Sequence, residues 1–127
     1  NDYVLQQIYE KLKENPRFKG FIYFSDHGED VEHNYGHEAS KYTATMSHIP
    51  LFMAFSPDFQ AERAQMVETL RSHENSYWTN DLLYDVMTDI LGIQGVPGTD
   101  LNWNLASSQY SMTKDTLRTL HGKQVLQ

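Results

Sequence analysis

The residues best suited to chemistry in this chain are a carboxylate and an imidazole at the end of an apolar run. Residues 21–24 are aromatic or β-branched, and Ser25, Asp26, His27 and Gly28 follow them directly. A buried strand that ends in this way delivers two ligands to a pocket at its carboxyl end. Carboxylate oxygen and imidazole nitrogen together suit zinc or a similar divalent ion. Asp26 and His27 are therefore candidate metal ligands, although two ligands do not complete a site.

More groups of the same kinds follow in the polar segment over residues 26–47. Four of the six histidines lie within 22 residues, with five acidic residues interleaved: His27, His33, His37 and His48, and Asp26, Glu29, Asp30, Glu32 and Glu38. A loop of this length in a compact domain is usually functional or disordered. For Asp30 and Glu32 we expect a solvated turn, with general acid–base work as the alternative. Gly28 should let the chain turn sharply and a ligand approach closely.

The composition of the chain restricts the kinds of molecule and metal ligand that the protein can use. The 127 residues suit one domain, and 39% hydrophobic content favours a folded chain. A net charge of −7 argues against a nucleic-acid or anionic-membrane surface. Without cysteine, a metal must be held by His, Asp, Glu or hydroxyl ligands. No apolar run approaches the roughly 18 residues of a membrane span. The chain starts at Asn1 rather than Met, so we expect a piece of a longer protein.

The candidate ligands depend on strands and helices that hold them. We expect a first helix capped by Asp2 and ended at Asn15-Pro16. Strands are expected over residues 19–25 and 49–55, on either side of the polar loop over residues 26–47. Strands separated by helices or long crossovers favour an α/β layer. So few strands cannot form a covered parallel sheet, and this supports the interpretation that the chain is a fragment.

Two helices are predicted after the second strand. The first has Ser56 as its N-cap and runs to about Arg71. The second is capped by Thr79 and terminated by Gly92. Their expected inward residues are Phe59, Ala64, Val67 and Leu70 in the first helix, and Leu82, Leu83, Val86, Met87, Ile90 and Leu91 in the second. In the tail, over residues 100–127, we expect a short strand near Tyr110 and a weakly helical segment near Leu117.

Three short motifs, taken in order and with their spacing, carry a family resemblance. They are Ser25-Asp26-His27-Gly28-Glu29, Gly36-His37 and Ile49-Pro50-Leu51-Phe52. Together they resemble the C-terminal part of the sulfatase-like phosphoethanolamine transferases, which belong to the alkaline-phosphatase superfamily. The resemblance covers residues 1–93, and residues 94–127 form a loosely similar tail. It implies that residues 1–127 are the C-terminal portion of an α/β/α sandwich.

By this resemblance, Asp26 and His27 are zinc ligands, and His37 binds the phosphoryl group or a second zinc. The family's threonine nucleophile and a further glutamate ligand would lie upstream, so the chain alone should be inactive. The implied reaction is attack of that threonine on a phospholipid donor, followed by transfer of phosphoethanolamine to lipid A or a glycan. The implied enzyme is anchored in the bacterial inner membrane by an N-terminal region and faces the periplasm.

Two alternatives remain open. Related sulfatases hydrolyse sulfuric esters and commonly hold calcium, but imidazole is a poor calcium ligand, so Asp26-His27 favours zinc. A second possibility is a non-catalytic module whose His-rich loop binds a metal or an anionic partner. The sequence upstream of Asn1 would separate them, because an upstream threonine and glutamate on strand ends would favour the enzyme.

Overall fold

Two antiparallel strands form the centre of the computed structural model, which describes residues 2–119 and 124–125. Strand β1 (Gly20–Phe24) pairs with β2 (Leu51–Phe55), and Ile22 lies opposite Met53. The expected mixed α/β class is confirmed, but the strands are not parallel neighbours. The intervening segment contains only the short 3-10 helices η1 (Ala39–Lys41) and η2 (Ala44–Ser47). No long helix therefore carries the chain back across the sheet, and β2 returns alongside β1.

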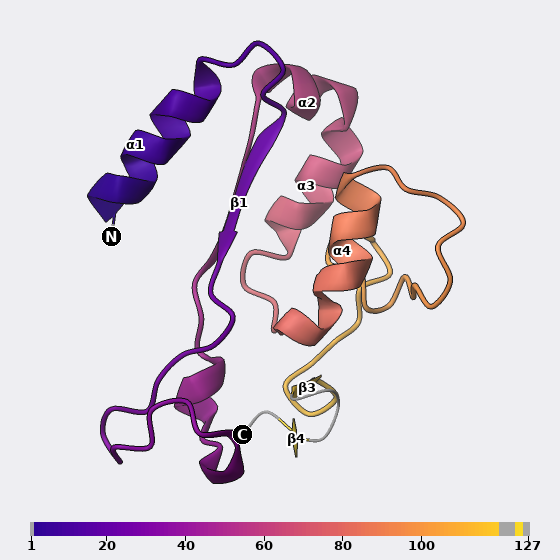
Figure 1. Ribbon diagram of the computed structural model, residues 1–127. Coiled ribbons are helices and arrows are strands. Elements are labelled where there is room, and N and C mark those ends of the chain that lie inside the picture. The colour runs from indigo at the N-terminus through magenta and orange to yellow at the C-terminus, as the bar shows by residue number, and fades with distance from the viewer. Residues whose placement is uncertain (1, 120–123, 126–127) are drawn as a thin grey trace.

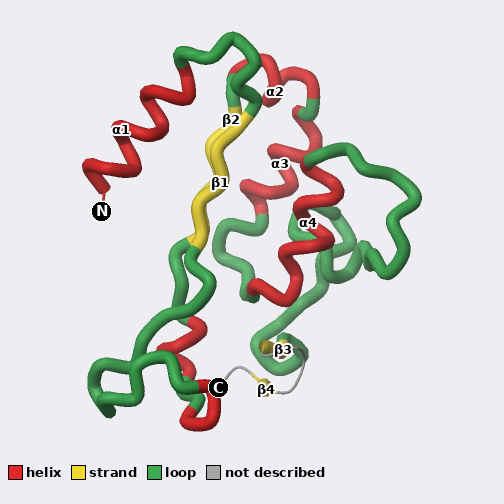
Figure 2. The backbone as a smooth tube through the Cα atoms, viewed as in Figure 1, coloured by secondary structure: helices red, strands yellow, loops and turns green. Residues whose placement is uncertain are grey.

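Helices lie on both sides of this hairpin, as in part of an α/β/α sandwich (Figures 1 and 2). On one side is α1 (Asp2–Lys13), and on the other are α2 (Pro57–Glu62), α3 (Ala64–Ser72) and α4 (Leu83–Ile90). The 3-10 helix η3 (Asn80–Leu82) leads into α4, and the short strands β3 (Arg118–Thr119) and β4 (Gln124–Val125) pair with each other. No helix among the described residues is long and apolar enough to cross a membrane.

The helix expected over residues 57–71 is divided at Arg63. Its start is as predicted, because the Ser56 hydroxyl accepts a hydrogen bond from the Phe59 amide at 3.2 Å. The Arg63 backbone leaves the helical region, and its guanidinium donates to the carbonyl and carboxylate of Asp89 at 2.9 and 3.0 Å. The break turns Ala64 outward, contrary to expectation, whereas Val67 is buried as predicted.

Helix α4 is terminated by Gly92 as expected, but its start is not capped by the Thr79 side chain as predicted. Gly92 adopts φ +68°, and the Ile93 amide donates to the Thr88 carbonyl at 2.9 Å, which closes the helix in a Schellman-type turn. Thr79 does not cap with its side chain. Its hydroxyl instead donates to the Arg118 carbonyl at 3.0 Å, because the tail passes beside it at Arg118. Leu91 is exposed rather than part of the apolar stripe.

The core lies between the hairpin and the helices α3 and α4. Ile22, Met53 and Phe55 pack against buried Val86 and its neighbours, and the tail adds Leu105 and Ala106. Met46 and Met66 are buried core residues, as expected of methionine. The tail predictions were wrong, because Tyr110 lies in no strand and no helix forms at Leu117. Leu117 is instead 1% exposed and anchors the tail.

The opposite face of the hairpin is only partly covered. The ring of Phe52 contacts those of Phe21 and Tyr23 there, and Tyr9 of α1 lies 6.0 Å from Phe21 between ring centroids. Helix α1 has no buried residue, and Phe52 remains 42% exposed. Strand β1 is therefore half-buried, not buried as its composition suggested, because a single helix reaches this face.

Candidate metal centre

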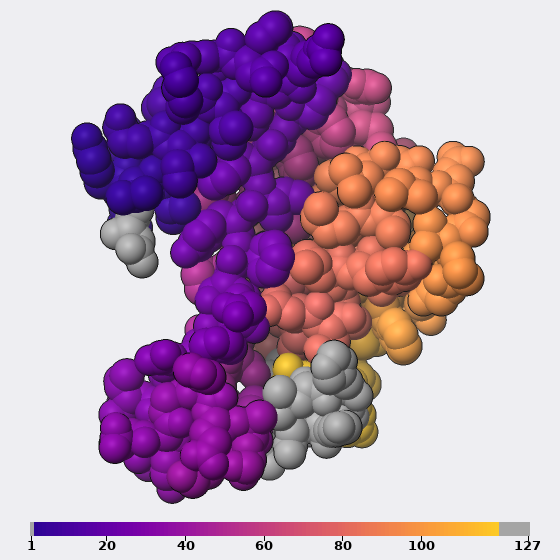
Figure 3. All heavy atoms as spheres, viewed as in Figure 1, coloured from indigo at the N-terminus to yellow at the C-terminus, as the bar shows by residue number. Residues whose placement is uncertain are grey.

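The His-rich loop leaves and re-enters the hairpin at one end. Because the strands are antiparallel, β1 ends at Phe24 beside Leu51, where β2 begins. The intervening residues form a lobe at that end of the molecule, coloured purple in Figure 3. The amide of Gly28 donates to the Met46 carbonyl at 2.8 Å, which ties the start of the loop to its return. The candidate ligands therefore lie on a loop closed upon itself.

The structure brings the two predicted ligands together with suitable geometry. Asp26 Oδ2 and His27 Nε2 lie 3.6 Å apart. Two ligands of a tetrahedral zinc, each bound at about 2.1 Å, are separated by about 3.4 Å. His27 Nδ1 lies 3.0 Å from the Gly28 carbonyl, which can only accept, so Nδ1 is the donor there and Nε2 is the ring nitrogen left for a metal. The pair fits two corners of a zinc coordination sphere.

His37 joins this pair from the far side of the loop. Its ring centroid lies 4.4 Å from that of His27. His37 Nδ1 is 3.3 Å from Glu29 Oε1, so the carboxylate accepts from Nδ1–H and leaves Nε2 available. Asp26, His27 and His37 line one cavity of about 180 Å³. Glu29 was not predicted to orient His37, because nothing local in the sequence reveals a pair eight residues apart.

The other loop histidines lie elsewhere. His33 contacts Asp30 through Nδ1, at 2.9 Å from Oδ2, and stacks on Tyr35. His48 is exposed and lies beside a different cavity. Within the described part of the chain, no three His, Asp or Glu side chains are grouped so as to hold a metal ion. The candidate ligands Asp26 and His27 would supply two of the usual four zinc ligands.

Asp30 is buried and organises the loop, contrary to the solvated turn expected for it. Only 1% of the residue is exposed, and its carboxylate accepts from the Thr43 hydroxyl at 2.6 Å and the His33 amide at 2.9 Å. These hydrogen bonds, that from Thr43 foremost, lower the pKa of Asp30 to about 2. The bond from Thr43 spans thirteen positions, so sequence spacing did not reveal it.

Gly28 also has a different role from the one predicted. A Cβ atom at this position would lie 2.6 Å from the Thr45 carbonyl oxygen and 3.1 Å from that of His48. The space beside Gly28 is therefore filled by the backbone of the returning loop, and not by a ligand. The glycine is needed because two backbone segments touch.

Asn80 reaches the ligand pair from η3, far along the chain. Its Nδ2 donates to the carbonyls of Ser25 and Asp26, each at 2.9 Å. It also lines the cavity that contains Asp26 and His27. No local pattern in the sequence indicates a role for Asn80 at this site, because the two hydrogen bonds join residues 54 and 55 positions apart.

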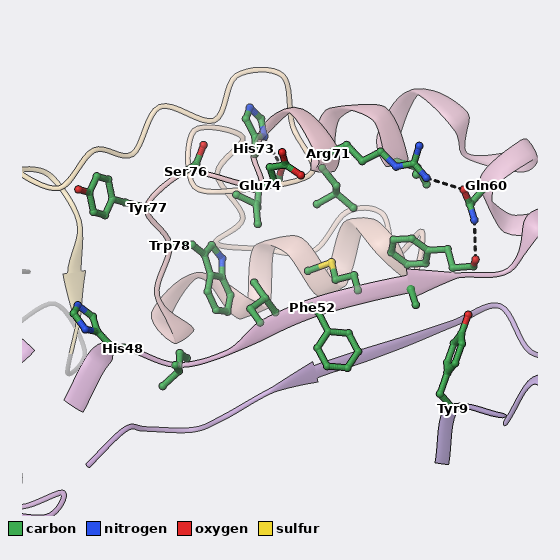
Figure 4. A pocket seen from close by; sticks show the side chains of 18 of the residues that line it. Tyr9, His48, Phe52, Gln60, Arg71, His73, Glu74, Ser76, Tyr77 and Trp78 are labelled. Carbon is green, nitrogen blue, oxygen red and sulfur yellow. Dashed lines mark hydrogen bonds between the residues drawn. The ribbon is translucent and has the colours of Figure 1, made fainter. Parts of the chain in front are cut away.

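A larger cavity of about 1000 Å³ runs along β2 and α3 (Figure 4). Phe52, Trp78 and His48 are among its lining residues, and Arg71 donates to Gln60 at 3.1 Å on one wall. Neither Asp26 nor His27 lines it. The chemistry of the side chains, not cavity volume, therefore identifies the candidate metal centre.

Comparison with known proteins identifies the family of the chain. The sequence model of the sulfatase family matches residues 1–90, which include the ligand motif, both central strands and the helices α1 to α4. No curated protein matches the chain, and no solved structure matches it. The family match covers well over half of the chain, and the chain belongs to the sulfatase family.

Proposed function

We propose that this chain supplies one side of the zinc centre of a phosphoethanolamine transferase of the sulfatase family, acting on a cell-envelope lipid or glycan. The observation that carries the proposal is the separation of 3.6 Å between Asp26 Oδ2 and His27 Nε2. The hydrogen bond from His27 Nδ1 to the Gly28 carbonyl adds to it, because it directs the Nε2 lone pair away from the backbone.

The donor set favours zinc over calcium. Imidazole nitrogen is a good zinc ligand, whereas calcium takes six to eight oxygen ligands. A bound zinc would supply a Lewis acid and lower the pKa of a hydroxyl nucleophile. The carboxylate of Asp26 contributes one negative charge, and neutral His27 contributes a lone pair. Calcium is the alternative if the protein is a sulfuric ester hydrolase.

His37 is assigned to the transferred phosphoryl group. It lies beside His27 in the same cavity, and Glu29 holds its Nδ1 proton. Because Glu29 engages Nδ1, Nε2 is the ring nitrogen left to contact an anionic oxygen of that group. A role as ligand to a second zinc is the alternative, in which Nε2 would be unprotonated.

The remaining machinery is proposed to come from an upstream region of a longer enzyme. Residues 1–127 would be the C-terminal portion of its catalytic domain, without the threonine nucleophile, and inactive alone. That enzyme would take phosphoethanolamine from a phospholipid and pass it to lipid A or a glycan. An N-terminal region would anchor it in the bacterial inner membrane, with the catalytic domain in the periplasm and no nucleic-acid partner.

The zinc assignment is tested in the full-length protein with Asp26→Ala and His27→Ala. Both variants should lose bound zinc, measured by elemental analysis after dialysis, and lose turnover of a phosphoethanolamine phospholipid. His48→Ala is the matched control, since it removes an exposed histidine of the same loop and should retain zinc. Wild-type zinc content in either ligand variant would reject the assignment.

The reaction class is tested with two substrates. The wild-type protein should transfer phosphoethanolamine from a phospholipid and leave an aryl sulfate intact. Hydrolysis of the sulfate ester alone would make the protein a sulfuric ester hydrolase. Zinc binding without turnover of either substrate would favour the non-catalytic module. His37→Ala should keep its zinc and lose turnover, whereas loss of zinc would assign His37 to the metal.

A further inference from the structure

We infer that Asn80 is a positioning residue for the zinc ligand Asp26, an inference that rests on the proposed zinc centre. Its side-chain amide donates two hydrogen bonds of 2.9 Å, to the carbonyls of Ser25 and Asp26. These carbonyls belong to the peptide groups immediately before and after the Asp26 Cα atom. One amide therefore holds the backbone on both sides of the ligand and fixes the direction of its Cα–Cβ bond.

Asp26 needs such support, because little else holds it. Its side chain is 86% exposed, and the carboxylate faces His27 at the rim of the cavity. A ligand on an exposed loop must be brought to one conformation each time the metal binds, and the lost freedom weakens binding. Fixing the backbone beforehand lowers that conformational cost.

Asn80 is itself on a well-packed element. Thr79, immediately before it, is 4% exposed and donates to the Arg118 carbonyl at 3.0 Å. Leu82 ends the same 3-10 helix and is 7% exposed, and Val86 on the following helix is fully buried. Asn80 thus anchors the loop to the hydrophobic core, since the loop has few buried contacts of its own.

The oxygen of the same amide supports this role. Asn80 Oδ1 is buried and accepts no hydrogen bond from the described residues. Rotating the amide would place Oδ1 against two carbonyl oxygens and remove both hydrogen bonds, so the observed orientation is fixed by its acceptors. Both N–H groups of Asn80 bond to the backbone after β1, while its oxygen stays unpaired. The side chain is therefore oriented by its contact with the Ser25 and Asp26 carbonyls.

The test measures the affinity of the full-length protein for Zn²⁺ alone, by competition with a chromogenic chelator. Residues that orient metal ligands typically change metal affinity by about 10- to 100-fold when removed. Asn80→Ala should weaken zinc binding by that factor. Asn104→Ala is the matched control, since it removes a buried amide that donates to Asp89 at 2.7 Å, remote from the site, and should leave zinc affinity unchanged.

A second variant keeps the shape of the side chain. Asn80→Asp preserves packing but replaces the two donors with an oxygen that faces two carbonyls. Its added negative charge would by itself attract zinc, so weaker binding in this variant can come only from lost positioning. Asn80→Leu has nearly the same shape, removes both donors and adds no charge. Zinc binding as tight as wild type in Asn80→Leu would overturn the inference, even if Asn80→Ala fails to fold.

A double-mutant cycle separates positioning from a general structural effect. In a protein that carries Asp26→Ala, Asn80→Ala should no longer weaken zinc binding, because the ligand it positions is gone. An equal loss of affinity in both backgrounds would reject the positioning role while the zinc centre stands. If Asp26→Ala alone leaves zinc affinity unchanged, the proposed zinc centre fails, and the role of Asn80 fails with it.

Discussion

Gly28→Ala should disturb the metal centre through a backbone contact. The added Cβ atom would lie 2.6 Å from the Thr45 carbonyl oxygen, a distance that real Cβ atoms essentially never show. An ordinary contact begins at 3.4 Å, so the two segments must separate by about 0.8 Å. Neither can yield as a flexible side chain would, because both are backbone. The separation also stretches the hydrogen bond from the Gly28 amide to the Met46 carbonyl, now 2.8 Å.

The displacement has two measurable consequences. Overpacking of a close contact costs about 1–3 kcal/mol, which should appear as a lower free energy of unfolding in urea. Ligand groups must be held to within about 0.5 Å of their productive geometry, and His27 directly precedes the displaced residue. Zinc affinity should therefore fall roughly tenfold, within the range typical of lost ligand support.

Gly95→Ala provides the control. Gly95 has a left-handed backbone, with φ +69°, and a Cβ atom there would meet no atom within 4 Å. It should lose about 1–2 kcal/mol of unfolding free energy from backbone strain alone and keep its zinc affinity. If Gly28→Ala binds zinc as tightly as the wild type, the close contact does not position the ligands, and the reasoning from the Thr45 carbonyl is wrong.

Three further predictions concern the elements that hold the site. Leu117→Ala should lower the unfolding free energy by about 2–5 kcal/mol, since the residue is 1% exposed, and a loss below about 1 kcal/mol in urea would contradict the tail's place in the core. Because the pKa of Asp30 is lowered to about 2, its ionised form stabilises the fold above about pH 4, and this stabilisation is lost as pH falls towards 2. Urea midpoints at pH 5 and 2.5 should therefore differ less in Asp30→Asn than in the wild type, and equal differences would contradict the role of Asp30. Ser56→Ala should cost about 1 kcal/mol, because its hydroxyl caps α2, and an unchanged urea midpoint would mean that the cap is not stabilising.

The features predicted correctly from the sequence are those that local chemistry controls. Ser56 caps its helix and Gly92 ends the next one, because each acts on backbone groups within a few residues. The errors have tertiary causes. Ala64 points outward because Arg63 breaks the helix to reach Asp89, and Thr79 donates to the Arg118 carbonyl instead of capping. Such partners, 26 and 39 positions away, leave no periodic pattern in the sequence.

The sequence by itself determined the family and the identities of the candidate ligands, since an apolar strand followed by Asp26 and His27 depends on residue type and order alone. Only the tertiary structure decided how they are arranged. It set the 3.6 Å between the two ligand atoms, brought His37 beside His27, and placed Asn80 against the strand end. The contacts of His37 and Asn80 join residues that are separated along the chain, and such packing, unlike helical or strand periodicity, follows no fixed spacing in the sequence.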